Sequence, residues 1–332
     1  MDSLTQIVLG AAVGEAILGK KIGNKAMLYG AIAGTIPDLD FLFSYFTDTV
    51  TALEIHRGFT HSLFFSLFFS PILGILVSKY EKYKSVKEWS LLFFLGFFTH
   101  ALLDAQTSWG TQLFWPFEMP LEFKNIFVID PLYTLPFLVF LCLAMKQNRK
   151  SKKRMIYNYL GITISSLYLL LTIVLKGISY NTFTQELNSQ NIRYKEIKTK
   201  PTPFNSVLWS ANVETDSSFL IGYSSFFDKK PIYFSEYPKN HHLLGNLVNH
   251  PKVQRMISIS KGWFTINKIG SNLYFNDLRF GLLSIQPNAK NFVFKYKIDI
   301  DKNGTPYFIE TTKNKSDGKK LLKDLIQRIS GN

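Results

Sequence analysis

The chain has 332 residues, 46% of them hydrophobic, and a formal net charge of +14. This length leaves room for two domains of about 150 residues each. A lone cysteine, Cys142, excludes an intrachain disulfide and a cysteine-based zinc site. An excess of basic residues suits a nucleic-acid partner, but no nucleic-acid-binding motif accompanies it. Anionic lipid also attracts positive charge. We therefore expect no nucleic-acid partner.

Hydrophobic runs divide the chain into two halves. No run after residue 176 is long enough to cross a bilayer. We therefore expect an α-helical polytopic membrane domain of about six helices over residues 1–176, followed by a small β-rich (α+β) domain over residues 177–332. The apolar segments of the first half are 4–19, 26–46, 62–78, 89–104, 132–145 and 157–176.

The first two segments have unusual compositions. Residues 1–6 carry Asp2 and no basic residue, so we expect no cleavable signal peptide there. The segment that follows is rich in glycine and alanine, which suits close helix packing. The second segment is interrupted by Gly34, Pro37 and two aspartates. Ionised groups are costly in hydrocarbon, so this segment is expected to be partly broken or to face a polar cavity.

Basic residues gather in every second connection between the apolar segments. The connections at 20–25, 79–87 and 146–154 are basic, whereas 47–61 and 105–131 hold one basic residue each. By the positive-inside rule, the basic connections lie in the cytoplasm. The pattern predicts a multi-pass protein of the cytoplasmic (inner) membrane. It also predicts that the C-terminal domain is extracytoplasmic.

Two motifs of the membrane half pair ionisable side chains at short spacing. His100 and Asp104 are four residues apart, so a helix would place both on one face, as nitrogen and oxygen ligands for a divalent metal. Asp38 and Asp40 follow Pro37 and are two residues apart. In an extended or turn segment, alternate side chains point the same way.

The third motif covers residues 56–62 and holds two histidines. His56 and His61 are five residues apart, and a continuous helix would splay them. Gly58 and Thr60 instead favour a loop that leads into a helix, with Thr60 as its cap. In that geometry both histidines can turn inward.

The predicted topology places all three motifs at the extracytoplasmic end of the membrane domain, where we expect one metal site. Imidazole and carboxylate without thiolate suit zinc, manganese or iron. The donor set suits either one open catalytic metal with surrounding partners or a two-metal cluster. The predicted metal ligands are Asp38, Asp40, His56, His61, His100 and Asp104.

Three residues near these motifs are predicted to take part in catalysis. A divalent metal lowers the pKa of its bound water and polarises a carbonyl or phosphoryl oxygen. The expected general base is a carboxylate that is not bound to the metal: either Asp130, or Asp40 where it acts as a base instead of a ligand. Arg57 either binds a phosphate or carboxylate of the substrate or pairs with an aspartate of the site.

These motifs resemble the YdjM-like inner-membrane proteins, which are classed as membrane-bound metal-dependent hydrolases. The resemblance covers about residues 1–180 and implies metal ligands at the six predicted positions. It also suggests a helical zinc phosphodiesterase-like site, as in zinc-dependent phospholipases C. The family commonly has a histidine where this chain has Gln6, so no ligand is implied there. The resemblance is carried by residues 1–5, 37–40, 56–62, 100–104 and 114–116.

The second half of the chain shows period-two alternation between turn residues, which predicts short strands. An amphipathic helix is expected from Asp317 to Ile329. A second metal site at His241, His242 and His250 is not expected, because adjacent histidines point different ways. The predicted strands cover 206–214, 219–227, 232–237, 273–280 and 292–300.

Our leading hypothesis is a membrane-bound metal-dependent hydrolase whose site opens at the outer face of the cytoplasmic membrane. The expected partner is the lipid bilayer, and the expected substrate is an amphiphile or envelope component, with a phosphoester first and an amide or ester second. The alternative is a non-enzymatic, metal-stabilised membrane scaffold or envelope-stress protein. A transporter with an aspartate ion path is a weaker alternative, because no internal repeat is evident.

Overall fold

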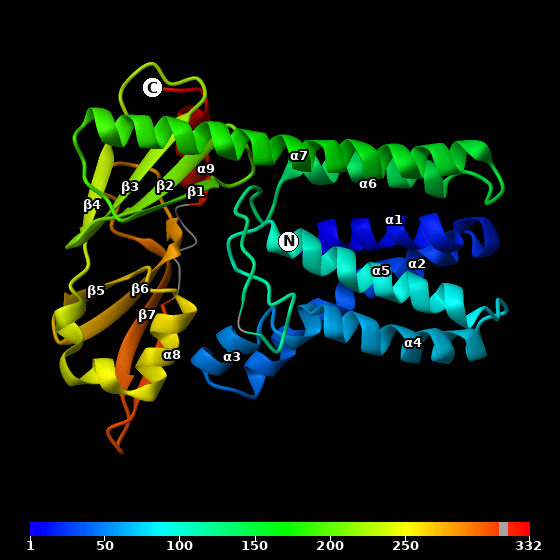
Figure 1. Ribbon diagram of the computed structural model, residues 1–332, viewed down its shortest axis with the longest axis horizontal. Helices are drawn as coiled ribbons and strands as arrows, with labels where there is room; N and C mark the ends of the chain where they lie inside the picture. Colours follow the sequence, from blue (N-terminus) through cyan, green and yellow to red (C-terminus); the bar gives the residue numbers. More distant parts are fainter. Residues whose placement is uncertain (118, 312–317) are drawn as a thin grey trace. The chain divides into compact units, whose positions relative to one another are not determined.

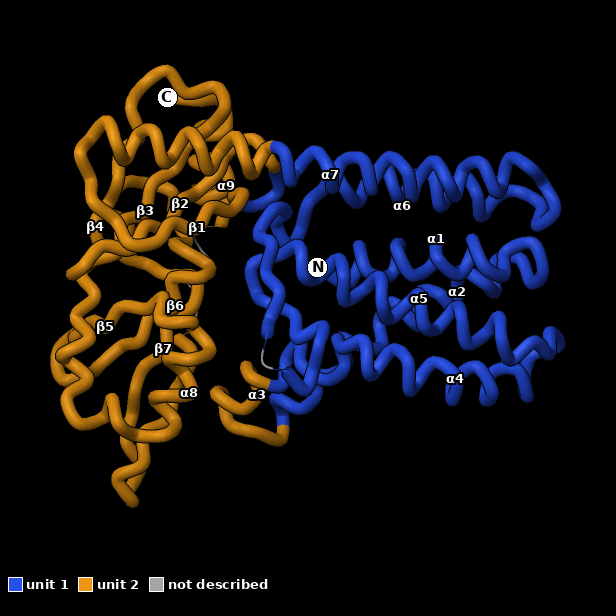
Figure 2. The backbone as a smooth tube through the Cα atoms, in the orientation of Figure 1, with its two compact units in different colours: residues 1–45, 55–174, 203–205 blue, residues 46–54, 175–202, 206–332 orange. Residues whose placement is uncertain are grey.

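The computed structural model describes residues 1–117, 119–311 and 318–332. The chain divides into two units (Figure 2). The membrane unit comprises Met1–Tyr45, Ile55–Val174 and Pro203–Asn205. The C-terminal unit comprises Phe46–Glu54, Leu175–Thr202 and Ser206–Asn332.

The membrane unit is helical, and each of the predicted apolar segments is helical, the second as two successive helices (Figure 1). In the described residues, four helical segments are long and apolar enough to cross a membrane: Asn24–Tyr45, Leu63–Tyr80, Val86–Ala105 and Lys152–Ser189. The expectation of a polytopic α-helical domain is thus confirmed. The helices are α1 (Ser3–Ile22), α2 (Asn24–Thr35), η1 (Ile36–Tyr45), η2 (Phe59–His61), α4 (Leu63–Tyr80), α5 (Val86–Ala105), α6 (Pro131–Met145) and the first part of α7 (Lys152–Ser189).

Helices α1 and α2 pack with their backbones in close approach, as the glycine-rich composition predicted. A Cβ atom added at Gly10 would lie 2.2 Å from the carbonyl oxygen of Gly30. One added at Gly34 would lie 2.4 Å from the carbonyl oxygen of Gln6. Small residues at such an interface let two helices approach until their backbones touch. This contact brings the end of α2 beside the beginning of α1, next to the site described below.

The second apolar segment is broken where the sequence indicated. Helix α2 ends at Thr35, and the chain continues as the 3₁₀-helix η1. The sequence predicts an extended or turn segment in which the Asp38 and Asp40 side chains point the same way. That expectation is wrong, because a 3₁₀-helix has three residues per turn and sends residues two apart in different directions.

The C-terminal unit contains two antiparallel four-stranded sheets, and its β-rich character is confirmed. Their orders are β1-β2-β3-β4 and β5-β6-β7-β8. The first sheet comprises β1 (Glu196–Pro201), β2 (Leu208–Glu214), β3 (Ser218–Ser225) and β4 (Phe234–Pro238). The second comprises β5 (Phe264–Ile269), β6 (Asn272–Leu282), β7 (Phe292–Ile300) and β8 (Pro306–Glu310). The helices are α3 (Thr49–Ile55, all but its last residue in this unit), η3 (His241–Asn249), α8 (Pro251–Ile259) and α9 (Gly318–Ile329).

Each predicted strand is present, with ends that differ by a few residues, whereas β1, β5, β8 and α8 were not predicted. The closing helix is present as α9, and its predicted first residue, Asp317, lies outside the described residues. Helix α7 continues to Ser189, past Gly177, so the predicted start of the second half lies within a helix, close to Leu175, where the C-terminal unit begins. Phe183 and Leu187 explain this extension, since both are fully buried against the first sheet.

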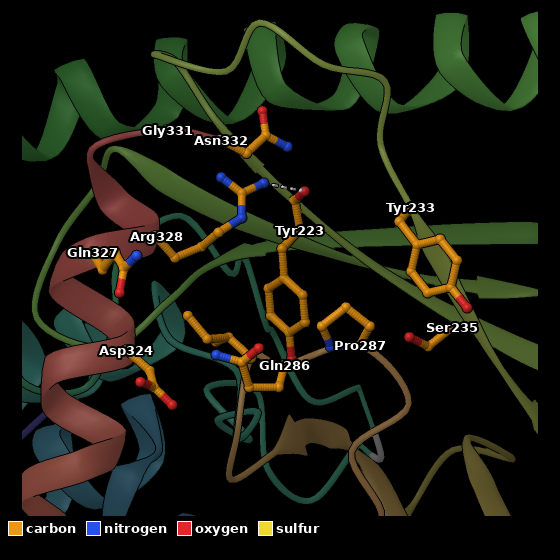
Figure 3. Close-up of a pocket in the computed structure, with 11 residues that line it drawn as sticks. Tyr223, Tyr233, Ser235, Gln286, Pro287, Asp324, Gln327, Arg328, Gly331 and Asn332 are labelled. Atoms are coloured by element: carbon orange, nitrogen blue, oxygen red, sulfur yellow. Dashed lines mark hydrogen bonds between the residues drawn. The ribbon is translucent and has the colours of Figure 1, made fainter.

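An open hollow of about 340 Å³ lies in the C-terminal unit beside α9 (Figure 3). Tyr223, Tyr233 and Gln286 are among the residues that line it, and Arg328 donates a hydrogen bond to the carbonyl oxygen of Tyr223. None of the residues predicted for the metal site lines this hollow.

Candidate metal centre

Helix α4 begins two residues after His61, the second histidine of the third motif, and its cap differs from the prediction. Ser62 is the N-cap, because its hydroxyl accepts a hydrogen bond from the amide of Phe65. Thr60, the predicted cap, instead directs its hydroxyl to Asp40 Oδ2 at 3.2 Å and to His61 Nδ1 at 3.1 Å. The hydroxyl that was expected to begin a helix therefore supports a histidine of the site.

Four of the predicted ligands meet in a group that we call the His/Asp cluster. Each offers one ligand atom, and these atoms all lie within 4.8 Å of one another. The cluster consists of Asp38, His61, His100 and Asp104. All but Asp38 have fully buried side chains, whereas the Asp38 side chain is 25% exposed.

The spacing of the ligand atoms approximates a tetrahedron. The Nε2 atoms of His61 and His100 are 3.1 Å apart, and Asp38 Oδ1 lies 3.3 and 3.4 Å from them. Asp104 Oδ2 lies 3.4 and 3.8 Å from the same two nitrogens. Ligand atoms at about 2.1 Å from a tetrahedral zinc ion are separated from one another by about 3.4 Å. The cluster therefore has the dimensions that one tetrahedral metal requires.

A bound metal would also satisfy a buried atom that the protein leaves unpaired. Asp104 Oδ2 is buried and has no hydrogen-bond partner in the described residues. Arg57 Nε lies 2.9 Å from it but is not aligned to donate. An unpaired buried oxygen of a carboxylate is costly, and coordination to a cation would remove that cost. The residues present thus fit a divalent metal.

Hydrogen bonds orient both imidazoles with Nε2 toward the centre of the cluster. His100 Nδ1 lies 2.7 Å from the carbonyl oxygen of Gly34, which can only accept, so Nδ1 carries the proton. His61 Nδ1 shares a hydrogen bond with the Thr60 hydroxyl at 3.1 Å, and Asp40 Oδ2 lies 3.4 Å from the same nitrogen. Metal-binding histidines commonly use one nitrogen for such a carbonyl or carboxylate partner and the other for the metal.

The electrostatics of His61 favour a positive charge at the cluster. Burial lowers the pKa of His61, but its contacts with Asp104, Asp38 and Asp40 outweigh burial and raise that pKa to about 10. Without a metal, the imidazole therefore holds a proton among three carboxylates. A divalent cation would displace this proton on binding.

The structure does not bring Asp40 or His56 into the tetrahedron, although both were predicted as ligands. Asp40 Oδ1 contacts His56 Nδ1 at 2.9 Å, and Asp40 Oδ2 accepts from the backbone amide of Arg57 at 2.9 Å. Because Asp40 Oδ2 also lies 3.4 Å from His61 Nδ1, Asp40 is a partner of both histidines of the third motif. The His56 side chain is 27% exposed, and its ring meets that of Trp109 edge-on, with centroids 5.0 Å apart.

Arg57 is placed as the partner of an aspartate, one of the two roles considered for it. Its side chain is 6% exposed, its Nε lies beside Asp104, and its Nη1 donates to Thr107 Oγ1 at 2.8 Å. Gln6 Nε2 donates to Asp104 Oδ1 at 2.9 Å, and the α-amino group of Met1 contacts the same oxygen. Gln6 therefore supports a ligand through its amide nitrogen, a role that spacing alone did not indicate.

Asp130 lies apart from these contacts. Its Oδ1 accepts from the backbone amide of Leu132 at 2.9 Å, which caps α6, and its Oδ2 accepts from the hydroxyl of Tyr168 at 2.9 Å. Burial raises the pKa of Asp130, and the Tyr168 hydrogen bond opposes that rise. The predicted role of Asp130 as a general base stays a prediction, and these helix-capping contacts do not favour it.

Comparison with known proteins gives a family match over the region that contains the cluster. The family model described as YdjM inner membrane protein matches residues 1–179. The uncharacterized protein YfhP of Bacillus subtilis (strain 168) is 32% identical over 126 residues, which cover 36% of this chain and 38% of YfhP. The inner membrane protein YbcI of Escherichia coli (strain K12) is 28% identical over 113 residues, which cover 34% of this chain and 64% of YbcI. No solved structure matches the chain.

Proposed function

Because the chain belongs to the YdjM inner membrane protein family, whose model matches residues 1–179, we propose that it is a membrane-bound metal-dependent hydrolase. One divalent metal is held by the His/Asp cluster, and the tetrahedral spacing of its four ligand atoms is the observation that carries this proposal. Two imidazoles and two carboxylates suit zinc first, with manganese or iron as alternatives. When bound, the metal supplies an acidified water and a Lewis acid that polarises a carbonyl or phosphoryl oxygen.

The exposed edge of the site holds a histidine suited to proton transfer. Asp40 fixes the His56 ring through Nδ1, and the ring centroids of His56 and His61 are 6.2 Å apart. An imidazole held by a carboxylate through one nitrogen can accept a proton at the other. His56 is therefore the proposed general base, and Asp40 positions it. Arg57 places its positive charge beside Asp104.

The substrate is proposed to be an amphiphile or an envelope component. The basic connections predict that the cluster lies at the outer face of the cytoplasmic membrane and that the C-terminal unit is extracytoplasmic. His100 and Asp104 lie in the last turns of α5, an apolar helix long enough to cross a membrane, which supports a site at the level of the lipid head groups. A phosphoester is the first candidate for the bond cleaved.

A second candidate function follows from the number of protein ligands. Structural zinc sites are usually closed by four protein ligands, whereas catalytic sites keep a position open. The cluster offers four, which favours a metal-stabilised membrane scaffold or envelope-stress protein. The exposure of Asp38 favours the hydrolase, because it leaves one side of the cluster accessible.

Metal analysis combined with turnover separates the two functions. Wild-type protein is expected to contain stoichiometric metal and to hydrolyse a member of a panel of phosphoester and lipid substrates. His100→Ala is expected to lose both, and His56→Ala to keep its metal while turnover falls about 100-fold or more. The hydrolase is ruled out if metal-loaded wild type turns over no substrate and removal of its metal costs only folded protein.

A further inference from the structure

A small pocket of the membrane unit lies between the end of α1 and the beginning of α7. Its volume is about 150 Å³, and the residues that line it include Lys20, Arg149 and Arg154. The connection between α6 and α7 lies at the same end of the unit as the end of α1 (Figure 1). Gln6, which contacts the His/Asp cluster, precedes Lys20 by about 21 Å along α1 at 1.5 Å per residue. The pocket is therefore a separate site, toward the opposite end of the unit from the cluster.

The floor of this pocket is held by polar contacts between buried side chains. Arg154 is 2% exposed and donates from Nε to Glu15 Oε1 at 2.6 Å and from Nη1 to Asn24 Oδ1 at 2.8 Å. Asn158 of α7 donates to the carbonyl oxygen of Ala12 in α1 at 3.0 Å. These contacts tie α7 to α1 and α2, so the pocket is formed without a ligand. The charges of Arg154 and Glu15 offset one another.

The rim of the pocket carries positive charge that no carboxylate offsets. Lys20 and Arg149 are exposed, and neither forms an ion pair within the described residues. Arg149 donates from Nη1 to the carbonyl oxygen of Lys21 at 3.1 Å, which holds its guanidinium at the end of α1. Lys21 itself is already paired with Glu88. The rim thus offers two cations to a ligand, and the N-terminus of α7 adds partial positive charge.

One side of the pocket is apolar and open to the surroundings of the helix. Met155 and Tyr159 both line the pocket, and they are 37% and 50% exposed. They are four residues apart on α7, so they lie on one face of the helix, one turn apart. Helix α7 is long and apolar enough to cross a membrane. Two cations beside an exposed apolar strip suit a ligand that joins an anionic head group to a hydrocarbon chain.

We propose that this pocket binds an anionic glycerophospholipid of the surrounding membrane. Lys20 and Arg149 hold its phosphate, and an acyl chain lies along Met155 and Tyr159. Basic pockets between membrane helices on the cytoplasmic side suit such head groups, and the basic connections predict that this end of the unit is cytoplasmic. The site shares no residue with the His/Asp cluster, so the proposal does not rest on the proposed hydrolase.

Native mass spectrometry of the full chain in detergent micelles tests this proposal. The protein is titrated with phosphatidylglycerol, which is anionic, and with phosphatidylcholine of the same acyl chains, which has no net charge. Each basic residue near an anionic lipid contributes about fivefold in affinity, so the wild type is expected to bind phosphatidylglycerol about 25-fold more tightly. Equal affinity for the two lipids would overturn the proposal.

Two double variants test the two cations of the rim. Lys20→Gln combined with Arg149→Gln is expected to weaken phosphatidylglycerol binding about 25-fold and to leave phosphatidylcholine binding unchanged. Lys20→Arg combined with Arg149→Lys keeps both charges and is expected to keep the preference for the anionic lipid. Since both side chains are exposed, the variants should elute as the wild type does in size-exclusion chromatography.

Lys82→Gln combined with Lys87→Gln is the matched control. It removes two exposed positive charges from another basic connection, at residues that do not line the pocket. Phosphatidylglycerol affinity is expected to stay at the wild-type value. Equal losses in this variant and in the Lys20→Gln, Arg149→Gln variant would show that the lipid responds to the general charge of the surface, and the pocket would be rejected as its site.

A last arm separates a lipid from a free phosphate. Glycerol phosphate, added as its ammonium salt in hundredfold excess over phosphatidylglycerol, carries the anionic group without an acyl chain. It is expected to displace little lipid, whereas Met155→Ser is expected to weaken the binding of both lipids alike. Complete displacement by glycerol phosphate would show that the pocket recognises a soluble phosphate and would contradict the lipid assignment.

Discussion

The centre of the membrane unit is built from ionisable side chains, whereas the sheets of the C-terminal unit enclose aromatic and aliphatic ones. His61, His100 and Asp104 are fully buried in a region of apolar helices. In the C-terminal unit the fully buried side chains include Ile266 and Phe275. A buried group of carboxylates needs a cation to offset its loss of hydration, whereas an apolar core needs none.

This difference separates what each unit requires in order to hold its structure. With the proposed metal in place, the membrane unit depends on a bound ion and on the partners that orient its ligands. The C-terminal unit depends on packed volume. Substitutions that remove metal ligands should therefore leave the C-terminal unit intact, and substitutions in its apolar core should leave the metal centre intact. The following variants test that separation.

The largest expected effect is at a ligand of the His/Asp cluster. His61→Ala removes one corner of the tetrahedron, and we expect it to abolish stoichiometric metal binding. Asp40→Asn keeps the shape of a residue that only orients a ligand, and we expect metal affinity to fall about 10- to 100-fold. Competition with a chelator of known affinity measures both. Equal losses in the two variants would show that Asp40 coordinates the metal directly, as the sequence first indicated.

A smaller effect is expected from a substitution that creates a cavity in the core of the C-terminal unit. Ile221 of β3 is 2% exposed and belongs to a cluster with Phe219 and Trp263, a different cluster from the one that contains Val50. Ile221→Ala should lower the free energy of unfolding of this unit by about 2–5 kcal/mol. Denaturant unfolding measures that loss. Metal content should not change, and a loss of metal in this variant would contradict the separation of the two centres.

The smallest effect concerns pH and His241. The His241 ring lies against that of Phe264, and its Nε2 donates to the carbonyl oxygen of Phe264 at 2.8 Å. Burial lowers the pKa of His241, with the Phe264 carbonyl opposing it, so the unfolded chain binds this proton more readily than the folded chain. Stability of the C-terminal unit is therefore full above the unfolded pKa of about 6.5 and falls as pH drops through it.

His241→Gln tests that contribution, because an amide can still donate to the Phe264 carbonyl but does not titrate. The unfolding midpoint of the C-terminal unit should fall less between pH 7 and pH 5 in this variant than in wild type. Identical pH profiles of the two proteins would show that His241 does not cause the loss of stability at low pH.

The sequence predicted those features that depend on neighbouring residues. Hydrophobic runs located the helices of the membrane unit, and the spacing of His100 and Asp104 placed both in one cluster because a helix repeats every 3.6 residues. The alternation of apolar and polar residues with period two, between turn residues, located five of the strands.

The features that the sequence did not predict depend on backbone geometry or long-range packing. The assignment of Asp40 assumed an extended segment, whereas η1 is a 3₁₀-helix that turns Asp38 and Asp40 to different sides. The partner of His100 Nδ1 is a backbone carbonyl at Gly34, 66 residues away, which no side-chain pattern reveals. The place of Val50 is likewise fixed by strands more than 200 residues later in the chain, such as β6 with Phe275.

Metal stoichiometry tests the central claim most directly. Wild-type protein and His61→Ala, purified in parallel from membranes without added chelator, would be analysed for zinc, manganese and iron by elemental mass spectrometry. The tetrahedral cluster predicts about one equivalent of one of these metals per wild-type chain and none in His61→Ala. A wild-type chain without metal, or an equal metal content in the two proteins, would contradict it.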